Sequence, residues 1–267
     1  MKHGVIVIDS RYTIASVQRS LMILKLFNSE RNKMTLSELS RLSGINKSSI
    51  LRIITTLTQE SFLKYDEISK RYSLGIELFR LGTVFGETMD LRNISREYIE
   101  KVSDETGLIV HLGILEESHV VIIEKLLPKQ FRDSIAMVSK VGGVVPLHCT
   151  GVGKVLLSFQ DDSKIDKLLK GYEYKKYSDK TISSYDELMA AIKTIRKNGY
   201  GINDGEHEPY IKCYTFPIFN YNNEIVAAMS LTGVVEKMNT YDSEYLVNTL
   251  REVTLKISSE LGYKKVG

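Results

Sequence analysis

The sequence is poor in cysteine and has no long hydrophobic run. Its 267 residues include only two cysteines, Cys149 and Cys213, which stand far apart and do not form a disulfide framework. We expect both to be free thiols. No apolar run approaches the roughly 18 residues that a membrane-spanning helix needs, and residues 5–8 are too short for the core of a signal peptide. These absences predict a cytoplasmic protein that does not span a membrane.

Several chemical signatures are also missing. Lys154 follows Gly153 but precedes Val155 where a phosphate loop needs Ser or Thr, and no third glycine completes a dinucleotide fingerprint. His207 and Glu208 begin like a zinc-protease motif, but Ile211 stands where the second histidine would be. The sequence therefore predicts neither a metal site nor a cofactor.

Length and charge indicate two different halves. A chain of this length suits two domains, and its 43% hydrophobic and 26% charged residues are typical of a globular protein. Residues 1–90 carry 13 basic and 9 acidic groups, whereas the remainder carries 23 and 24. This modest basic excess in the first half is weak evidence for a nucleic-acid partner. Residues 1–15 form an extension in which Lys2 and Arg11 suggest a basic arm.

The most informative segment predicts two short helices joined by a tight turn. Thr35 and Glu38 have the spacing of a capping box, so the first helix begins there. Gly44 ends it, and Asn46 is suited to cap the second helix. The resulting helix-turn-helix is typical of proteins that read DNA. The first helix would bury Leu36, Leu39 and Leu42.

The second helix has one apolar side and one polar side. At 100° per residue, Ile50, Ile53, Ile54 and Leu57 share the inner side. Hydroxyl groups on the outer side can contact bases or phosphates, and an arginine can bind guanine. The alternative is an ordinary solvated helix. The candidate DNA-binding residues here are Lys47, Ser48, Ser49, Arg52 and Thr55.

Two short strands follow this helix, at about residues 61–65 and 70–75, around a polar turn. Lys64, Lys70 and Arg71 would place this hairpin beside the DNA backbone as a wing, although a hairpin with merely solubilising charges remains an alternative. A preceding helix at residues 16–27 would point Val17, Leu21 and Leu24 inward. Residues 16–75 are therefore predicted to form a winged helix-turn-helix domain.

Five segments in order resemble the IclR family of bacterial transcriptional regulators, and the resemblance spans nearly the whole chain. The segments are SVQRSLMILKLF, LSELSRLSGINKSSILRIITTLTQESFL, RYSLGIELFRLG, PLHCTGVGKVLL and EHEPYIKCYTFPIF. The resemblance implies dimerisation through the first half and a GAF-like effector-binding domain in the second half.

Residues 76–90 are predicted to form a linker helix. Leu78, Leu81, Phe85 and Met89 make a long apolar stripe on it. We expect this stripe to pair with a second copy, because a dimer suits a palindromic double-stranded DNA operator. The alternatives are a stripe that packs on its own chain and, beyond the dimer, a tetramer.

From residue 91 to 267 the pattern changes to helices and mainly antiparallel strands, so the whole chain is of the α+β class. We expect strands at residues 109–115, 119–126, 133–140, 200–203, 212–220 and 225–232. We expect helices at residues 94–106, 151–159, 163–170, 185–197 and 243–261.

A small-molecule pocket is predicted in this domain. Gly151 opens a helix whose free N–H groups suit an anion such as a carboxylate or sugar acid. Cys213, Ser230 and Thr232 would share one face of the sheet. Alternatively, the glycine permits close packing of the helix, and the hydroxyls form hydrogen bonds with nearby backbone groups. The resemblance implies effector-pocket positions for Gly151, Val152, Asn203, Ile211, Cys213, Ser230 and Thr232.

The sequence also departs from the family pattern. Tyr210 stands where a glycine is usual, Tyr214 and Phe216 replace small residues, and Asn203 stands where an acid is common. We expect the aromatic side chains to reshape the pocket, by shrinking it or by stacking on a ligand ring. Two other functions stay open, namely a DNA-bound architectural protein whose second domain only oligomerises and an enzyme that uses Cys149 or Cys213 as a nucleophile.

Overall fold

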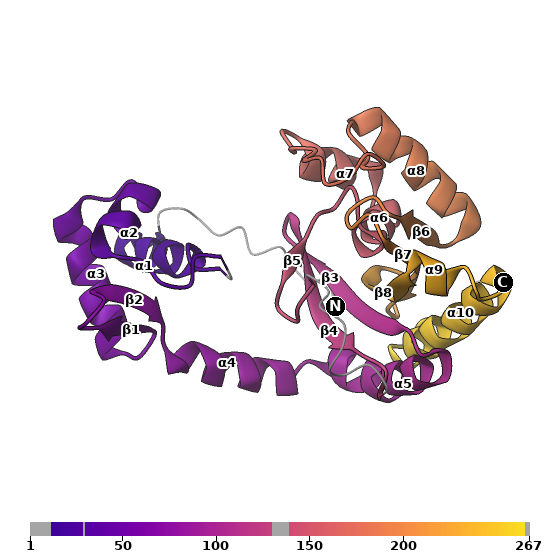
Figure 1. Ribbon diagram of the computed structural model, residues 1–267, viewed down its shortest axis with the longest axis horizontal. Coiled ribbons are helices and arrows are strands. Elements are labelled where there is room, and N and C mark those ends of the chain that lie inside the picture. The colour runs from indigo at the N-terminus through magenta and orange to yellow at the C-terminus, as the bar shows by residue number, and fades with distance from the viewer. Residues whose placement is uncertain (1–11, 29, 130–138, 265–267) are drawn as a thin grey trace. The chain divides into compact units, whose positions relative to one another are not determined.

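The computed structural model describes residues 12–28, 30–129 and 139–264, and Figure 1 shows their helices and strands. The chain divides into two compact units that meet between Met89 and Asp90. Lys2 and Arg11, the expected basic arm, lie outside the described residues. Within the described ranges, no helix is long and apolar enough to cross a membrane.

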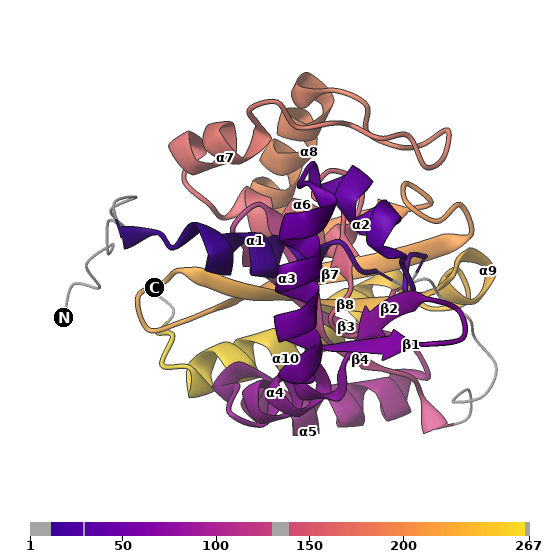
Figure 2. The same cartoon turned by 90° about the vertical axis from the view of Figure 1, so that its left-hand side faces the viewer.

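The first unit is a three-helix core with a hairpin and a further helix. Ile23 of the first helix, Ile50 and Ile54 of the third, and Leu63 of the first strand all belong to one buried apolar cluster. Figure 2 shows the third helix in front, between the first helix and the hairpin. The elements are α1 (Ala15–Lys25), α2 (Leu36–Ser43), α3 (Lys47–Gln59), β1 (Leu63–Asp66), β2 (Arg71–Leu74) and α4 (Ile76–Glu87).

Local capping signals set the limits of α2 and α3, as predicted. The amide of Glu38 donates to Thr35 Oγ1 at 3.2 Å, and the amide of Thr35 donates to the Glu38 carboxylate at 2.7 Å. Gly44 ends α2 with a φ of +69°, a left-handed conformation that is costly for residues with a Cβ. Asn46 Oδ1 accepts from the amide of Ser49 at 2.9 Å. The predicted capping box and helix-turn-helix are therefore confirmed.

The predicted inner face of α1 is wrong for Val17 and Leu21, whereas Leu24 packs against the buried apolar cluster as predicted. Val17 and Leu21 are 52% and 53% exposed, and Leu24 is only partly buried. Ile23 and Phe27 are buried instead. The segment carries apolar residues on more than one side, so periodicity alone offers two possible inner faces. Packing against α3 selects the one that contains Ile23.

The second unit is built on a six-stranded sheet with helices on both faces. The strand order is β5-β4-β3-β8-β7-β6, and every neighbouring pair is antiparallel. α6 contacts β3, β7 and β8 and carries α8 behind it, while α10 packs on β7 and α5 packs on β4 and α10. Figure 1 shows α6, α7 and α8 on one side of the strands and α5 and α10 on the other. The α+β fold is confirmed.

The bounds of these elements differ little from the predicted ones. Of the strand expected at residues 133–140, residues 133–138 lie outside the described residues, and Ser139 and Lys140 are not in a strand. The sequence did not predict the two-residue strand β5 or the short helix α9. The elements are α5 (Asp90–Thr106), β3 (Ile109–Glu116), β4 (His119–Leu126), β5 (Val144–Val145), α6 (Gly151–Ser158), α7 (Asp162–Leu169), α8 (Tyr185–Asn198), β6 (Gly201–Asp204), β7 (Ile211–Phe219), β8 (Ile225–Val234), α9 (Val235–Met238) and α10 (Ser243–Glu260).

Candidate functional site

The outer face of α3 is polar and exposed. Lys47, Ser48, Arg52 and Thr55 are exposed, and Ser49 is partly buried. The hydroxyl of Ser48 donates to Asn46 Oδ1 at 2.8 Å, and the hydroxyl of Thr55 donates to the carbonyl of Leu51 at 2.7 Å. Both hydroxyl oxygens therefore keep lone pairs for an outside donor. Ser49 and Arg52 also line a groove that α3 forms with α1.

The hairpin carries its basic residues in two different settings. Lys64 and Lys70 are exposed. The guanidinium of Arg71 donates to the carbonyl of Lys33 at 3.1 Å and to the Glu38 carboxylate at 3.3 Å. Arg71 thus connects the hairpin to the start of α2. Its positive charge is partly neutralised by the Glu38 carboxylate. An antiparallel β-bridge between Met34 and Tyr72 connects the same two segments.

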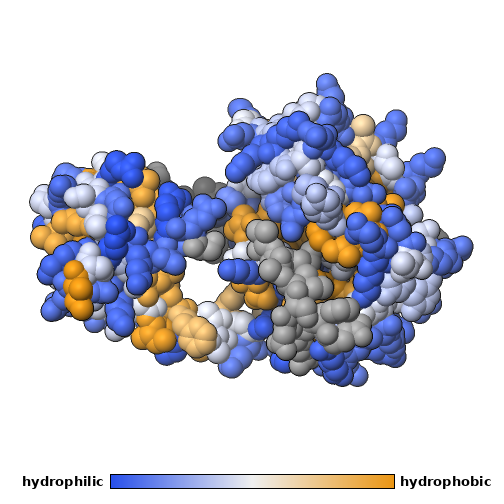
Figure 3. Space-filling model, viewed as in Figure 1, coloured by the Kyte–Doolittle hydropathy of each residue, from blue (hydrophilic) through white to orange (hydrophobic). Residues whose placement is uncertain are grey.

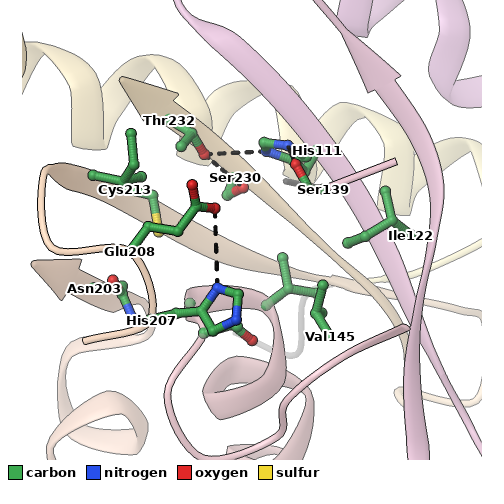
Figure 4. A pocket seen from close by; sticks show the side chains of 14 residues that line it. His111, Ile122, Ser139, Val145, Asn203, His207, Glu208, Cys213, Ser230 and Thr232 are labelled. Atoms are coloured by element: carbon green, nitrogen blue, oxygen red, sulfur yellow. Dashed lines mark hydrogen bonds and ion pairs between the residues drawn. The ribbon is translucent and has the colours of Figure 1, made fainter. Parts of the chain in front are cut away.

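The second unit contains a cavity of about 70 Å³ between the sheet and the start of α6. All seven predicted effector positions line it, and Figure 4 shows their side chains together with those of the other lining residues. The sequence analysis did not assign the rest to a pocket. These further lining residues are His111, Ile122, Ser139, Val145, Thr150, His207 and Glu208.

Strand register explains why distant residues meet in this cavity. Asn203, Cys213 and Thr232 are cross-strand partners on β6, β7 and β8. Partners directly opposite each other in a sheet point to the same face. Gly151 brings α6 close to this face, since a Cβ there would lie 2.3 Å from Thr215 Oγ1 and 2.7 Å from Cys213 Sγ. The glycine therefore serves close packing as well as the opening of the helix toward the cavity.

Among the further residues that line the cavity, His111 is the most buried polar one. Its Nδ1 lies 3.2 Å from Thr232 Oγ1 and its Nε2 lies 2.8 Å from Ser139 Oγ. Ser230 Oγ continues this series of hydrogen bonds, at 3.2 Å from Thr232 Oγ1. Burial lowers the pKa of His111 to about 3, so its ring is neutral at neutral pH. The available signal was a lone histidine within an otherwise apolar predicted strand.

His207 and Glu208 enter the cavity from the loop between β6 and β7. The ring of His207 lies 4.6 Å from the ring of Tyr177, and its Nδ1 lies 4.0 Å from a Glu208 carboxylate oxygen. Burial lowers the pKa of His207, with a smaller contribution from His148, so this ring is also neutral. The sequence analysis tested this pair only as part of a metal motif, although it lies in a segment that carries the family resemblance.

A buried ion pair joins this loop to α6. Lys154, 3% exposed, forms an ion pair with Glu206 and donates to the carbonyl of Ile202 at 3.0 Å. Burial raises the pKa of Glu206, although Lys154 opposes the change. The other carboxylate oxygen of Glu206 has no hydrogen-bond partner within the described part of the chain. The pair fixes the loop relative to the helix that opens the cavity.

The two cysteines are free and buried, and neither is activated. Burial raises the pKa of Cys149 to about 12 and also raises the pKa of Cys213. Nucleophilic catalysis by cysteine requires the thiolate, which these environments disfavour. Among the described residues, no group of His, Cys, Asp and Glu side chains is arranged to hold a metal ion.

The expectation that aromatic side chains reshape the cavity is wrong. Tyr210 is 74% exposed and does not line it. Tyr214 and Phe216 alternate with Cys213 along β7, so they point to the opposite face of the sheet. There Phe216 stacks on Tyr200, with ring centroids 5.1 Å apart. Because side chains alternate between the two faces of a strand, Tyr214 and Phe216 do not lie on the face that lines the cavity.

Comparisons with known proteins agree with this architecture. The model of the C-terminal domain of bacterial IclR transcriptional regulators matches residues 85–259, and the model of the IclR helix-turn-helix domain matches residues 16–67. The transcriptional regulator XynR of Escherichia coli is 30% identical over 250 residues, which cover 94% of this chain and 98% of XynR. KdgR of the same organism is 29% identical and covers 94% of each chain. A solved transcriptional regulator from Alicyclobacillus acidocaldarius is similar with a TM-score of 0.80 and 27% identity, over 94% of this chain and 100% of that one.

Proposed function

The chain belongs to the IclR family of bacterial transcriptional regulators, and on that premise we propose that it binds an inverted-repeat operator and responds to a small metabolite. The winged helix-turn-helix is the DNA-binding part, and the second unit is the effector-binding domain. One observation carries the proposal. The side of α3 that bears Arg52 is exposed, while its other side is buried in the apolar cluster of the first unit. The activity belongs in the cytoplasm, where bacterial DNA lies.

Each candidate DNA contact has a role that follows from its place. Arg52, with Ser48 and Thr55 beside it, reads base edges in the major groove. Lys47 at the start of α3 and the exposed wing lysines Lys64 and Lys70 bind phosphates. Arg71 contributes less, because Glu38 already neutralises part of its charge.

The active form is a homodimer, which presents two copies of α3 to the two half-sites. Support comes from α4, which has no buried residue. Phe79 and Phe85 on this helix are 73% and 64% exposed, and Figure 3 shows apolar atoms on the surface over α4. The exposed Val17 and Leu21 of α1 add to the apolar surface of this unit. A second copy would cover such surfaces.

The effector is a small ligand with a carboxylate. The start of α6 lines the cavity with backbone N–H groups that have no helical acceptor, and these groups suit an anion. The ligand controls DNA binding only if its affinity differs between two arrangements of the dimer. The neutral, hydroxyl-rich surroundings of His111 then orient the rest of the ligand.

Fluorescence anisotropy with the full-length protein tests the proposal. One duplex comes from the DNA upstream of this protein's own gene, and a scrambled duplex of equal length is the control. We expect at least hundredfold tighter binding of the native duplex and a steep fall of affinity with salt. Equal, weak binding of both duplexes contradicts an operator at this position.

A further inference from the structure

A groove on the first unit extends the exposed face of α3 toward α1. Its walls carry two arginines, Arg19 of α1 and Arg52 of α3. Most of the other side chains that line it bear a hydroxyl, and the described residues of its lining include no acidic one. The remaining lining residues are Ser16, Val17, Ser20, Ser49, Ile53 and Thr56. This α1–α3 groove therefore offers an anion positive charge and hydroxyl groups.

The two helices that form the groove carry charge of one sign only. Neither α1 nor α3 contains an aspartate or a glutamate. Within the described part of the chain, no carboxylate pairs with the guanidinium of Arg19 or of Arg52. Arg71 of the hairpin differs, since it pairs with Glu38. The positive charge beside α1 is thus available to a partner of opposite charge.

The dimensions of DNA bring a sugar-phosphate backbone to each flank of a helix that lies in the major groove. The major groove is about 12 Å wide, and a helix with its side chains is about 10–12 Å across. In this unit β1 and α1 both contact α3, and Figure 2 shows α3 between α1 and the hairpin. With α3 in the major groove, as proposed above, one backbone faces the wing and the other faces the α1–α3 groove.

Arg19 points away from the apolar side chains of α1 that we assign to the dimer. Val17 and Leu21 each stand two residues from Arg19, which is about 200° around a helix. Arg19 itself is exposed. A second copy that covers Val17 and Leu21 can therefore leave Arg19 open to DNA.

We propose, building on the DNA-binding part of the proposed function, that Arg19 binds a phosphate of the backbone that runs along the α1–α3 groove. A guanidinium can donate two parallel hydrogen bonds to phosphate oxygens. The hydroxyl of Ser49 on the opposite wall can donate to the same backbone. Because a phosphate carries no sequence information, this contact positions α3 and adds affinity on any duplex. The helix α1 is then a third DNA-contacting element, beside α3 and the wing.

Anisotropy titrations of the full-length protein test the role of Arg19. They use the duplex from upstream of this protein's own gene and the scrambled duplex, at two salt concentrations. Arg19→Ala should weaken binding of both duplexes by similar factors, at least threefold, because the contact does not depend on sequence. The slope of log affinity against log salt should fall by about 0.9 for each half-site. Arg19→Lys keeps the charge and should recover most of the affinity.

Lys25→Ala is the matched control. Lys25 is exposed on the same helix but does not line the groove. Its replacement removes an equal charge, so it measures the effect of net charge alone, and we expect a loss of less than twofold. Sedimentation velocity and thermal unfolding should show that Arg19→Ala has the oligomeric state and the unfolding temperature of the wild type.

Single methylphosphonate substitutions in the DNA locate the contact. Each replaces one charged phosphate oxygen of the upstream duplex by a neutral methyl group. At one phosphate in each half-site, the substitution should weaken binding of the wild type at least threefold and leave binding of Arg19→Ala unchanged. Two partners that lose their interaction together in this way are in contact or coupled through a shared neighbour.

Three results overturn the inference. They are a loss in Arg19→Ala no larger than that in Lys25→Ala, a loss confined to the upstream duplex, and an altered oligomeric state of Arg19→Ala. The last result would make the groove a contact between copies of this chain.

The scrambled duplex keeps this test separate from the operator proposal. If the wild type binds both duplexes equally, the operator proposal fails, and the comparison of Arg19→Ala with Lys25→Ala on the scrambled duplex still decides the role of Arg19. If the wild type selects the upstream duplex and the two variants behave alike, only the role of Arg19 is refuted.

Discussion

At the scale of single residues, the basic groups of the DNA-binding unit differ in what they can recognise. Arg52 lies midway along the exposed face of α3, whereas Lys47 stands at its first residue. A guanidinium can donate two parallel hydrogen bonds to guanine, but an ammonium is a point charge that suits any phosphate. We therefore expect Arg52 to serve sequence selection and Lys47 to serve general affinity.

Alanine substitutions separate these roles. Arg52→Ala should cost about 1–3 kcal/mol on the operator and much less on random DNA. Lys47→Ala should weaken binding to both duplexes and lower the salt slope by about one. Anisotropy titrations at two salt concentrations measure both effects. Equal losses on both duplexes for Arg52→Ala would remove Arg52 from base recognition.

The buried imidazole of His111 makes stability depend on pH. Its pKa falls from the ordinary value of 6.5 to about 3 because burial disfavours the charged ring. Between these values the unfolded chain binds a proton that the folded chain excludes. The contribution to stability is complete above pH 6.5 and is lost as the pH falls toward 3, at up to about 1.4 kcal/mol per pH unit.

His111→Asn tests this effect, because asparagine can keep hydrogen bonds to Thr232 and Ser139 without titrating in this range. Urea unfolding of both proteins between pH 7 and 4 gives two curves of stability against pH. The variant should have the shallower curve, since all other titrating groups are shared. Parallel curves would show that the ring of His111 is accessible to protons in the folded protein.

At the scale of elements, the helix-turn-helix depends on its caps. Thr35 exchanges hydrogen bonds with Glu38 at the start of α2. Thr35→Ala should therefore destabilise the protein by about 1 kcal/mol, as measured by denaturant unfolding. The exposed neighbour Ser37 supplies the control, because Ser37→Ala removes a hydroxyl without a capping role. Equal stability of both variants would mean that the capping box contributes nothing.

These elements also show what could be predicted from the sequence and why the rest could not. The limits of α2 and α3 depend on residues a few positions apart, so the sequence predicts them. The inner face of α1 depends on α3, and the chain there offers apolar residues on two sides. His111 and Glu208 reach the cavity through strand register and a loop that distant hydroxyls hold. Such contacts leave no periodic signal in the sequence.

At the scale of the whole molecule, the exposed apolar side chains of α4 support the dimer that we propose. We predict that Phe85→Lys converts the dimer to a monomer and weakens operator binding, because a buried lysine at an apolar interface is costly. Glu87→Lys introduces a lysine on the side of α4 away from Phe79 and Phe85 and should preserve the dimer. Sedimentation velocity of the full-length variants measures the change. A dimer that persists in Phe85→Lys would move the interface away from α4.

The buried pair of Lys154 and Glu206 bears on how this sensor could evolve. It holds the loop through residues that do not line the cavity, while His207 and Glu208, the next two along the chain, do line it. The residues that hold the loop and the residues that line the cavity are therefore different neighbours along the chain. A descendant gene could exchange His207 or Glu208, and with them part of the cavity lining, while the ion pair that joins this loop to α6 stays in place.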